Sequence, residues 1–351
     1  MPIFQNRLLL WMLYPLEFIY RLIISIRNWL YDHGWRNVQK LPCKVISVGN
    51  IVAGGVGKTP VVAFLADYLT QTGAQVAVLT RGYRRKRKGQ ILLEPKAQLP
   101  YSADDIGDEP YLLARRLKDI PIIVDRKRWR GGKLAVDRYK TEICLLDDGF
   151  QYRNLFRDLE IVVIDATAPF SNGKLLPAGL LREPLSRLQA ADLIWLTRVD
   201  QASQNLTEIE TQLRQWSTSP IVYSIHQPDR LIAIANGDEL EPQALANQPV
   251  VAFCGIGNPE SFYQTLKSLG AEIKEWLIFP DHHRYKIENL KKIRELANRY
   301  PVCRFVTTEK DGVKIRQLEF NFDNFWLLRI RIKIIKGLRN LQERLDFVLK
   351  I

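Results

Sequence analysis

A glycine-rich stretch, GGVGKT (54–59), contains the residue types that bind a phosphate chain. In such a loop, backbone N–H groups and the start of the following helix surround the phosphates. The Lys58 ammonium would reach the β- and γ-phosphates of a nucleotide, and the Thr59 hydroxyl would bind Mg²⁺. We therefore expect ATP and Mg²⁺ as cofactors. The expected nucleotide-binding residues are Val52, Ala53, Gly54, Gly55, Val56, Gly57, Lys58 and Thr59.

The segments on either side of this loop support the interpretation. Residues 43–48 form a short apolar run rich in β-branched residues, which predicts a buried strand. Residues 61–73 carry apolar side chains at helical spacing, and Gly73 is the expected stop. The consensus loop begins with a glycine where this chain has Val52. A glycine-rich turn with a chance Lys-Thr is the alternative, and it does not explain the flanking strand and helix.

Acidic residues follow a second predicted strand. EICLLDDGFQ (142–151) is an apolar run that ends in Asp147 and Asp148. In a phosphate-loop enzyme, an acid at the end of a neighbouring strand commonly helps to hold the magnesium. A polar turn after a strand is the alternative, since DDG also suits a turn.

Two further segments carry groups that could move a proton. GDEP (107–110) places Asp108 and Glu109 just before Pro110, where either acid could cap a helix that has the proline at its first position. Capping alone would explain these acids. FPDHHRY (279–285) places His282 beside Asp281, and a histidine next to a carboxylate can act as a proton relay. A solvated loop histidine is the usual alternative.

Charge and cysteine content limit the class of protein. Lys and Arg number 51 against 38 Asp and Glu, so the net charge is +13, which suits nucleic acid, anionic lipid or phosphorylated substrates. Six of the residues 81–88 are basic, and DRKRWRGG (125–132) is a second basic cluster. No known nucleic-acid reader motif is recognised, so we expect no nucleic-acid partner. The four cysteines form no C-x-x-C pair and are expected to be reduced core thiols.

The N-terminal segment 4–35 is long and apolar but is interrupted by charges. It lacks a cleavage site for secretion. No uncharged run reaches the ~18 residues of a membrane span. On a helical wheel, Arg7, Glu17, Arg21 and Asn28 fall on one side, and the rest is mostly Leu, Ile, Phe, Trp and Tyr. This profile predicts an amphipathic helix lying in a membrane interface. A helix packed on its own domain is the alternative.

Alternating apolar runs and helical patterns predict an α/β fold. The expected strands are near-continuous apolar runs, typical of a parallel sheet covered on both faces. We expect a P-loop NTPase-like parallel sheet with flanking helices, followed by a second, smaller α/β lobe. The expected boundaries are an N-terminal membrane-associating helix at 1–35, a P-loop kinase lobe at 36–200, a smaller α/β lobe at 201–330 and a basic helical tail at 331–351.

The ordered set of motifs resembles one family. GGVGKTP, RGY, GDEP, LDDGFQ, LPAGLLREPLSRL, GIGNPESF, DHH and TEKDGVKI occur in this order. Together they resemble the tetraacyldisaccharide 4′-kinases, the lipid A 4′-kinases of Gram-negative envelopes, over roughly residues 10–330. The resemblance implies a peripheral enzyme at the cytoplasmic face of the inner membrane. It would use ATP and Mg²⁺ to phosphorylate the 4′-hydroxyl of a tetraacyldisaccharide 1-phosphate in lipid A biosynthesis. It implies no obligate protein partner beyond that lipid and the membrane surface.

The resemblance also implies roles for single residues. Asp108 would be the catalytic base, His282 would pair with it across the two lobes, and Lys58 would bind the transferred phosphate. Two departures are the more basic run after the Tyr of RGY and the tail after residue 330, which matches nothing in the family pattern. The remaining implied roles are metal binding by Thr59, Asp147 and Glu183, and substrate binding by Tyr83, Arg128, Asp148 and Gln151.

Two other classes compete with a lipid kinase. A soluble P-loop GTPase or ATPase would typically carry N-K-x-D at a strand end to read guanine. LTRVD (196–200) is the nearest approach and lacks the Asn-Lys, and TTEKD (307–311) shares only the Lys-Asp. A nucleic-acid-binding module is suggested by net charge alone and predicts tight binding that weakens steeply with salt.

Overall fold

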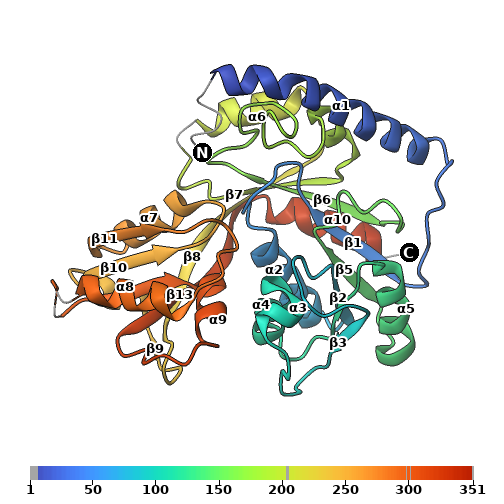
Figure 1. Cartoon of the computed structure of the whole chain (residues 1–351). Coiled ribbons are helices and arrows are strands. Elements are labelled where there is room, and N and C mark those ends of the chain that lie inside the picture. Colours follow the sequence, from blue (N-terminus) through green and yellow to red (C-terminus); the bar gives the residue numbers. More distant parts are fainter. Residues whose placement is uncertain (1–6, 203–204, 298, 301, 350–351) are drawn as a thin grey trace. The chain divides into compact units, whose positions relative to one another are not determined.

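The computed structural model describes residues 7–202, 205–297, 299–300 and 302–349, and it has a mixed α/β fold (Figure 1). The chain forms two compact units, which we describe separately. Unit 1 comprises residues 1–80, 127–225 and 334–351, and unit 2 comprises residues 81–126 and 226–333. Both units are therefore built from segments that are distant in the sequence, whereas the sequence led us to expect one boundary near residue 200.

Unit 1 contains a parallel sheet in the order β8-β7-β6-β1-β5-β2. All residues of β2, β5, β6 and β7 are buried, as predicted for a sheet covered on both faces. The strands are β1 (Lys44–Gly49), β2 (Val76–Thr80), β5 (Ile143–Asp147), β6 (Leu159–Asp165), β7 (Leu193–Thr197) and the first part of β8 (Ile221–Ala233). The helices are α1 (Arg7–Asp32), α2 (Lys58–Gln71), α5 (Arg128–Tyr139), η2 (Leu185–Ala190), α6 (Leu206–Arg214) and α10 (Leu338–Leu349).

The register of this sheet positions the predicted chemistry. Val48, near the end of β1, lies opposite Asp147, the last residue of β5. The glycine-rich loop leaves β1 one residue later. Because β1 and β5 are parallel, the loop and the acidic pair lie at the same edge of the sheet, the edge where α/β proteins bind ligands.

Unit 2 contains the strands β11-β10-β12-β13-β8 in this order, and β9 pairs antiparallel with β8. The antiparallel pair of β3 with β4 belongs to the 81–126 segment. The strands are β3 (Ile91–Leu93), β4 (Ile122–Val124), β9 (Glu239–Leu240), β10 (Pro249–Cys254), β11 (Glu272–Ile278), β12 (Arg304–Thr308) and β13 (Phe325–Lys336). The helices are α3 (Ala103–Ile106), α4 (Asp108–Arg116), η3 (Pro242–Leu245), α7 (Pro259–Ser268), α8 (Ile287–Ala297) and α9 (Glu309–Ile315).

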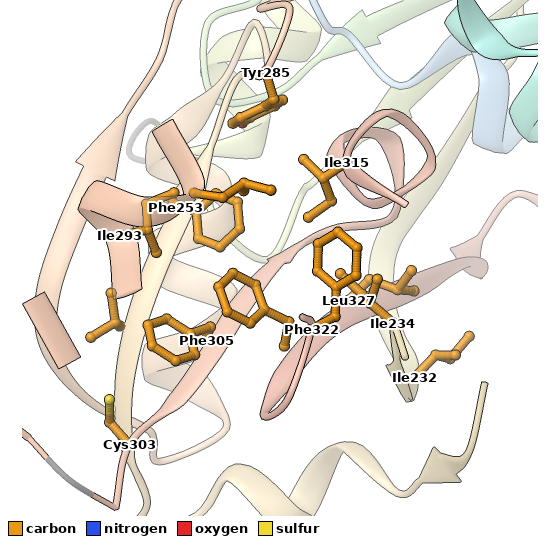
Figure 2. Close-up of a cluster of buried hydrophobic side chains, with 13 residues drawn as sticks. Ile232, Ile234, Phe253, Tyr285, Ile293, Cys303, Phe305, Ile315, Phe322 and Leu327 are labelled. Atoms are coloured by element: carbon orange, nitrogen blue, oxygen red, sulfur yellow. The ribbon is translucent and has the colours of Figure 1, made fainter. Parts of the chain in front are cut away.

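Aromatic side chains form much of the core of unit 2 (Figure 2). Phe305 and Phe325 stack with their ring centroids 4.3 Å apart, and Phe253 meets Phe325 edge-on at 6.2 Å. Tyr285 joins this cluster from the loop that follows β11, with its ring 6.0 Å from that of Phe253. The core therefore anchors the DHH segment, which lies in the same loop.

The C-terminal tail differs from the prediction of a helix. Residues 325–336 form the strand β13, and the helix α10 begins only at Leu338. The strand sequence FWLLRIRIKIIK alternates apolar and basic side chains near its end, a period of two that favours a strand. Gly337, with φ of 85°, separates the two elements.

Helix α1 contacts the rest of unit 1 through its polar side chains. Glu17 and Asn28 are buried, and the Tyr20 hydroxyl donates to the backbone oxygen of Arg182 at 3.0 Å. The Glu17 carboxylate accepts the backbone N–H of Leu175 at 3.2 Å. The opposite, apolar side of the helix is exposed. Among residues 12–32, whose side chains the structure describes, seven large apolar side chains have half or more of their surface accessible: Met12, Leu16, Phe18, Ile19, Leu22, Ile23 and Ile26.

Candidate active site

The glycine-rich loop connects β1 to α2 as the sequence predicted. Helix α2 begins at Lys58, directly after Gly57, whose φ of 93° is a left-handed conformation that favours glycine. The loop is fixed on one side by the LREP segment. Ala53 N–H donates to the Leu180 oxygen at 2.7 Å, and Arg182 N–H donates to the Ile51 oxygen at 2.7 Å. The first part of the loop is therefore held like a short strand pair.

The end of β7 fixes the other side of the loop. The Thr197 hydroxyl donates to the Val56 oxygen at 2.8 Å, and the Arg198 guanidinium donates to the Gly55 oxygen at 3.0 Å. Arg198 also forms a buried ion pair with Asp165 at the end of β6. In the sequence, LTRVD (196–200) is only a poor match to a guanine-reading motif. The residues support the phosphate loop instead, and local sequence carried no signal for that contact.

Asp148 lies between two cations at this edge of unit 1. Its carboxylate is 3.5 Å from the Lys58 ammonium and accepts two hydrogen bonds from Arg182, at 2.9 and 3.2 Å. Burial raises the pKa of Asp148, but the charges of Lys58 and Arg182 lower it by more, so this pKa lies well below its ordinary value. Asp148 is thus ionised beside the lysine that we expect to bind phosphate.

The neighbouring predicted residues gather around Asp148. Asp147 is buried and accepts a hydrogen bond from the Thr80 hydroxyl at 3.1 Å. Gln151 donates to the Asn50 oxygen at 2.7 Å. Arg128 donates to the Asp148 backbone oxygen at 3.4 Å and stacks on the Tyr152 ring at 3.9 Å. The structure therefore brings Lys58, Asp147, Asp148, Gln151 and Arg128 together within unit 1.

Glu183 has a different environment. Its side chain is buried, and both carboxylate oxygens accept hydrogen bonds from α1, one from Arg27 at 2.5 Å and one from Asn28 at 3.0 Å. The contacts of Glu183 therefore attach α1 to unit 1. Its expected metal role gains no support from these contacts.

In unit 2, Asp108 begins helix α4. Gly107 occupies the N-cap position with φ of 101°, and no side chain caps the helix. The hypothesis that Asp108 or Glu109 serves as cap is therefore wrong, and Pro110 is the third helical residue rather than the first. A Cβ at Gly107 would lie 3.0 Å from the Tyr83 backbone oxygen, so the RGY and GDEP segments approach backbone to backbone.

His282 meets Asp108 in the same unit. The Nδ1 atom of His282 lies 3.0 Å from Oδ2 of Asp108, although the residues are 174 positions apart. His282 has φ of 59°, in the left-handed region. His283 instead stacks on Phe279 with ring centroids 4.7 Å apart. One histidine of DHH thus anchors the loop and the other reaches Asp108. The predicted pairing across two lobes is an interaction within unit 2.

Basic and aromatic groups surround this pair. The Tyr83 ring lies 5.5 Å from the His282 ring, and the Lys314 ammonium lies 3.8 Å from Oδ2 of Asp108. Burial raises the pKa of Asp108, but the hydrogen bond with His282 and the charge of Lys314 lower it by more, so the net shift is downward. Asp108, His282, Tyr83, Lys314 and Arg284 line a cavity of about 210 Å³.

The side chains of unit 1 that the sequence suggests for metal binding carry oxygen donors, which suit magnesium better than a transition metal. No group of three or more His, Cys, Asp or Glu side chains suited to a metal occurs in the described part of the chain. Mg²⁺ usually takes one or two carboxylates and completes its shell with phosphate oxygens and water. Thr59, Asp147 and Asp148 carry oxygen donors of this hard type.

Comparisons with known proteins agree with these features. The family model described as tetraacyldisaccharide-1-P 4′-kinase matches residues 9–350. The tetraacyldisaccharide 4′-kinase of Syntrophus aciditrophicus is 43% identical over 86% of this chain and 83% of its own length. The enzyme of the same name from Halothermothrix orenii is 36% identical over 94% of this chain and 90% of its own. A crystal structure of the "apo" form of LpxK from Aquifex aeolicus in complex with ATP superposes with a TM-score of 0.77. It is 33% identical, with 97% of this chain and 99% of that chain covered.

Proposed function

This chain belongs to the tetraacyldisaccharide-1-P 4′-kinase family, and from that premise we propose that it phosphorylates the 4′-hydroxyl of a tetraacyldisaccharide 1-phosphate, a step of lipid A biosynthesis. As a member of this family the chain is a kinase that uses ATP with Mg²⁺. The observation that carries the proposed chemistry is the hydrogen bond of 3.0 Å between Asp108 and His282 at the wall of a polar cavity.

A sugar hydroxyl needs a base because its pKa lies far above 7. In our proposal the Asp108 carboxylate accepts the hydroxyl proton as the oxygen attacks the γ-phosphorus of ATP. The new O–P bond forms, the bond from that phosphorus to the bridging oxygen of ADP breaks, and the proton stays on Asp108. General-base assistance of this kind is worth roughly 10²- to 10⁴-fold in rate. His282 orients the carboxylate through its ring N–H.

The residues of unit 1 would hold the nucleotide. Lys58 would bind the β- and γ-phosphates, and the loop 52–59 would supply backbone N–H groups. Thr59, Asp147 and Asp148 would hold Mg²⁺, which neutralises charge on the phosphates when it is bound. Lys58 is 3.5 Å from Asp148, so an arriving phosphate would share the ammonium with this carboxylate.

We further propose that Tyr83, Arg128 and Gln151 contact the lipid headgroup. Tyr83 is half exposed and lines the cavity beside Asp108. Arg128 is buried, and its guanidinium is oriented by the Tyr152 ring and the Asp148 backbone. Arginine suits a phosphorylated sugar because its planar donors match phosphate oxygens.

The surface of α1 supports a place on the membrane. Among the residues that the structure describes, none of the helices combines the length and apolar character needed to cross a bilayer. Helix α1 instead buries Glu17 and Asn28 and exposes its apolar side. An exposed apolar face of this size marks an interaction surface, and an acylated substrate resides in a membrane. We propose peripheral binding at the cytoplasmic face of the inner membrane, where ATP is available.

Transfer of ³²P from ATP to purified tetraacyldisaccharide 1-phosphate in mixed micelles tests the function. We expect a labelled lipid product with the full-length protein and Mg²⁺. The Asp108→Asn variant, which keeps the shape of the side chain, should give at least 100-fold less product, the lower part of the range for a general base. Release of ³²P only as inorganic phosphate, with no labelled lipid, would contradict a lipid kinase and favour a soluble P-loop NTPase. Faster use of GTP than ATP would do the same.

A further inference from the structure

The second ring nitrogen of His282 faces a lysine that the proposed mechanism does not use. The Lys310 ammonium lies 3.4 Å from Nε2 of His282 and 3.2 Å from the Asp281 carboxylate. Lys310 and Lys314 are one helical turn apart on α9, so both point from the same face of this helix. Lys310 therefore approaches the His282 ring from the side opposite to Asp108.

The hydrogen-bonding roles of these groups determine where the ring proton lies. An ammonium group has donors and no acceptor, so Nε2 of His282 must accept in its contact with Lys310. A neutral imidazole that accepts at one nitrogen carries its proton on the other. That proton is then on Nδ1, which donates to Oδ2 of Asp108 at 3.0 Å. Asp281 cannot compete as acceptor for Nε2, because its Oδ2 lies 3.9 Å away.

We propose that Lys310 is a positioning residue that keeps the His282 ring neutral, with its single proton on Nδ1 and directed at Asp108. The inference rests on the proposed role of Asp108 as the base. A neutral ring gives Asp108 one oriented hydrogen bond. A doubly protonated ring would place a full positive charge beside the carboxylate and make it a weaker base.

The charges around His282 explain why a cation is needed there. Without Lys310, the ring would lie between the carboxylates of Asp108 and Asp281, an arrangement that favours a second ring proton. Burial lowers the pKa of Lys310, but Asp281 with Glu109 and Asp108 raises it by more, so the lysine remains an ammonium. The titratable or charged groups near this site are Asp104 from α3, Asp108 and Glu109 from α4, Tyr83 and Arg84 from the segment after β2, Asp281, Arg284 and Tyr285 from the loop itself, and Lys310, Asp311 and Lys314 from α9.

The test combines a spectroscopic readout with kinetics. The full-length protein is labelled with ¹⁵N-histidine, and the His282 ring signals are assigned by their loss in His282→Gln. At pH 7 we expect the wild-type ring to be protonated on Nδ1 and unprotonated on Nε2. In Lys310→Met, Nε2 should acquire a proton. Lys310→Arg keeps a donor without an acceptor and should preserve the wild-type pattern, as should the control Lys286→Met at an exposed position of the same unit.

The kinetic prediction separates positioning from nucleotide binding. In Lys310→Met we expect kcat to fall roughly tenfold, because a charged ring weakens the base. The KM for ATP should stay within about twofold of the wild-type value, since Lys310 acts on His282 beside the base, whereas the loop 52–59 binds the nucleotide. The acid limb of the pH–rate profile should move to higher pH, and Lys310→Arg should restore most of the activity.

Two results would overturn the proposal. A wild-type ring that carries its proton on Nε2 would do so by itself, and this result does not depend on the folding of Lys310→Met. An unchanged ring signal in folded Lys310→Met would do so as well. Failure of the proposed base is a separate outcome: Asp108→Asn would then retain its turnover, whatever the His282 spectrum shows.

Discussion

At the scale of single residues, both halves of the proposed chemistry are carboxylates with basic neighbours. Asp148 lies beside Lys58 and Arg182, and Asp108 lies beside His282 and Lys314. Burial raises both pKa values, but the charges of Lys58 and Arg182 outweigh it at Asp148, and the hydrogen bond with His282 and the charge of Lys314 outweigh it at Asp108, so both pKa values are lowered. An ionised carboxylate suits either role, because both Mg²⁺ binding and proton abstraction need the charged form.

Lys58→Ala should abolish phosphoryl transfer and leave the fold intact. The lysine is the first residue of α2 and supplies a charge rather than core volume. We expect a loss of at least 1,000-fold in kcat/KM, of the order seen when a main transition-state charge is removed. Circular dichroism should be unchanged. Lys133→Ala, on the exposed side of α5, is the matched control, and near wild-type turnover of Lys58→Ala would remove the phosphate-loop interpretation.

Asp108→Ala and His282→Ala should each slow the chemical step more than they weaken ATP binding. Since the two side chains share a hydrogen bond of 3.0 Å, the double variant should be little worse than the poorer single variant. Single-turnover rates for the three variants, with ATP affinity measured in parallel, test this. Losses that multiply fully would indicate two independent roles.

The lowered pKa of Asp148 predicts an acid-dependent stability. A group whose pKa is lower in the folded state stabilises that state above its unfolded pKa, and this contribution is lost as the pH falls toward the folded value. The ordinary value is 3.8, so the loss should begin near and below pH 4. Urea unfolding of wild type and Asp148→Asn between pH 7 and 3 should show a shallower pH dependence in the variant. An identical slope would mean that the lysine and arginine contacts do not persist in solution.

At the scale of elements, α1 is an amphipathic helix with its polar side turned toward the protein. Glu183, Leu175 and Arg153 of unit 1 all bind it through polar contacts. The sequence left two readings open, a helix in a membrane interface and a helix packed on its own domain. In the structure, α1 packs on its own domain through its polar side chains. Its apolar side stays exposed, so it is free to lie in a membrane interface. Deleting α1 would remove the partners of Glu183 as well. Substitutions on the exposed side of α1 are therefore a cleaner test of membrane binding.

Leu22→Glu combined with Ile26→Glu should weaken binding to anionic vesicles. Both side chains are at least half exposed, so the fold should tolerate the change. Burial of each large apolar side chain is worth about 2 kcal/mol, and two lost contacts should reduce vesicle binding more than 100-fold. ATP affinity should be unchanged. Val302→Glu, at an exposed position of unit 2, is the control, and a double variant that floats with vesicles as well as wild type would refute the interfacial role of α1.

At the scale of the whole molecule, the chain passes between its two units four times, after Thr80, after Arg126, within β8 and within β13. The net charge of +13 adds a long-range attraction to anionic membranes. This attraction acts together with the apolar contact of α1 and has a different dependence on salt.

High salt should release the protein from membranes only in part, and detergent should release it fully. Basic groups near an anionic surface contribute about 1 kcal/mol each and are screened by salt. Apolar burial at ~25 cal/mol per Å² is not screened. Flotation at 0.1 M and 1 M salt, followed by detergent, measures both parts. Complete release by salt alone would indicate that charge without α1 accounts for the association.

The sequence by itself determined the local chemistry of this protein. Short-range periodicity and residue type account for three local features: the strand, glycine loop and helix around Lys58, the buried parallel strands, and the stripe of polar residues on the first helix. The confirmed fold class rests on such patterns, and the confirmed family rests on the order of short motifs along the chain. These features are readable because each depends on neighbours within one or two turns of chain.

Tertiary structure decided which distant residues meet. From residue types alone, Asp108 could be explained as a helix cap and His282 as an ordinary loop histidine. Only the fold places their side chains 3.0 Å apart, although they are separated by 174 positions in the sequence. In the same way, Glu183 binds α1, Arg198 supports the phosphate loop and the tail contains a strand. Such contacts depend on long-range packing and on the exact course of the backbone, for which a single sequence carries no periodic signal.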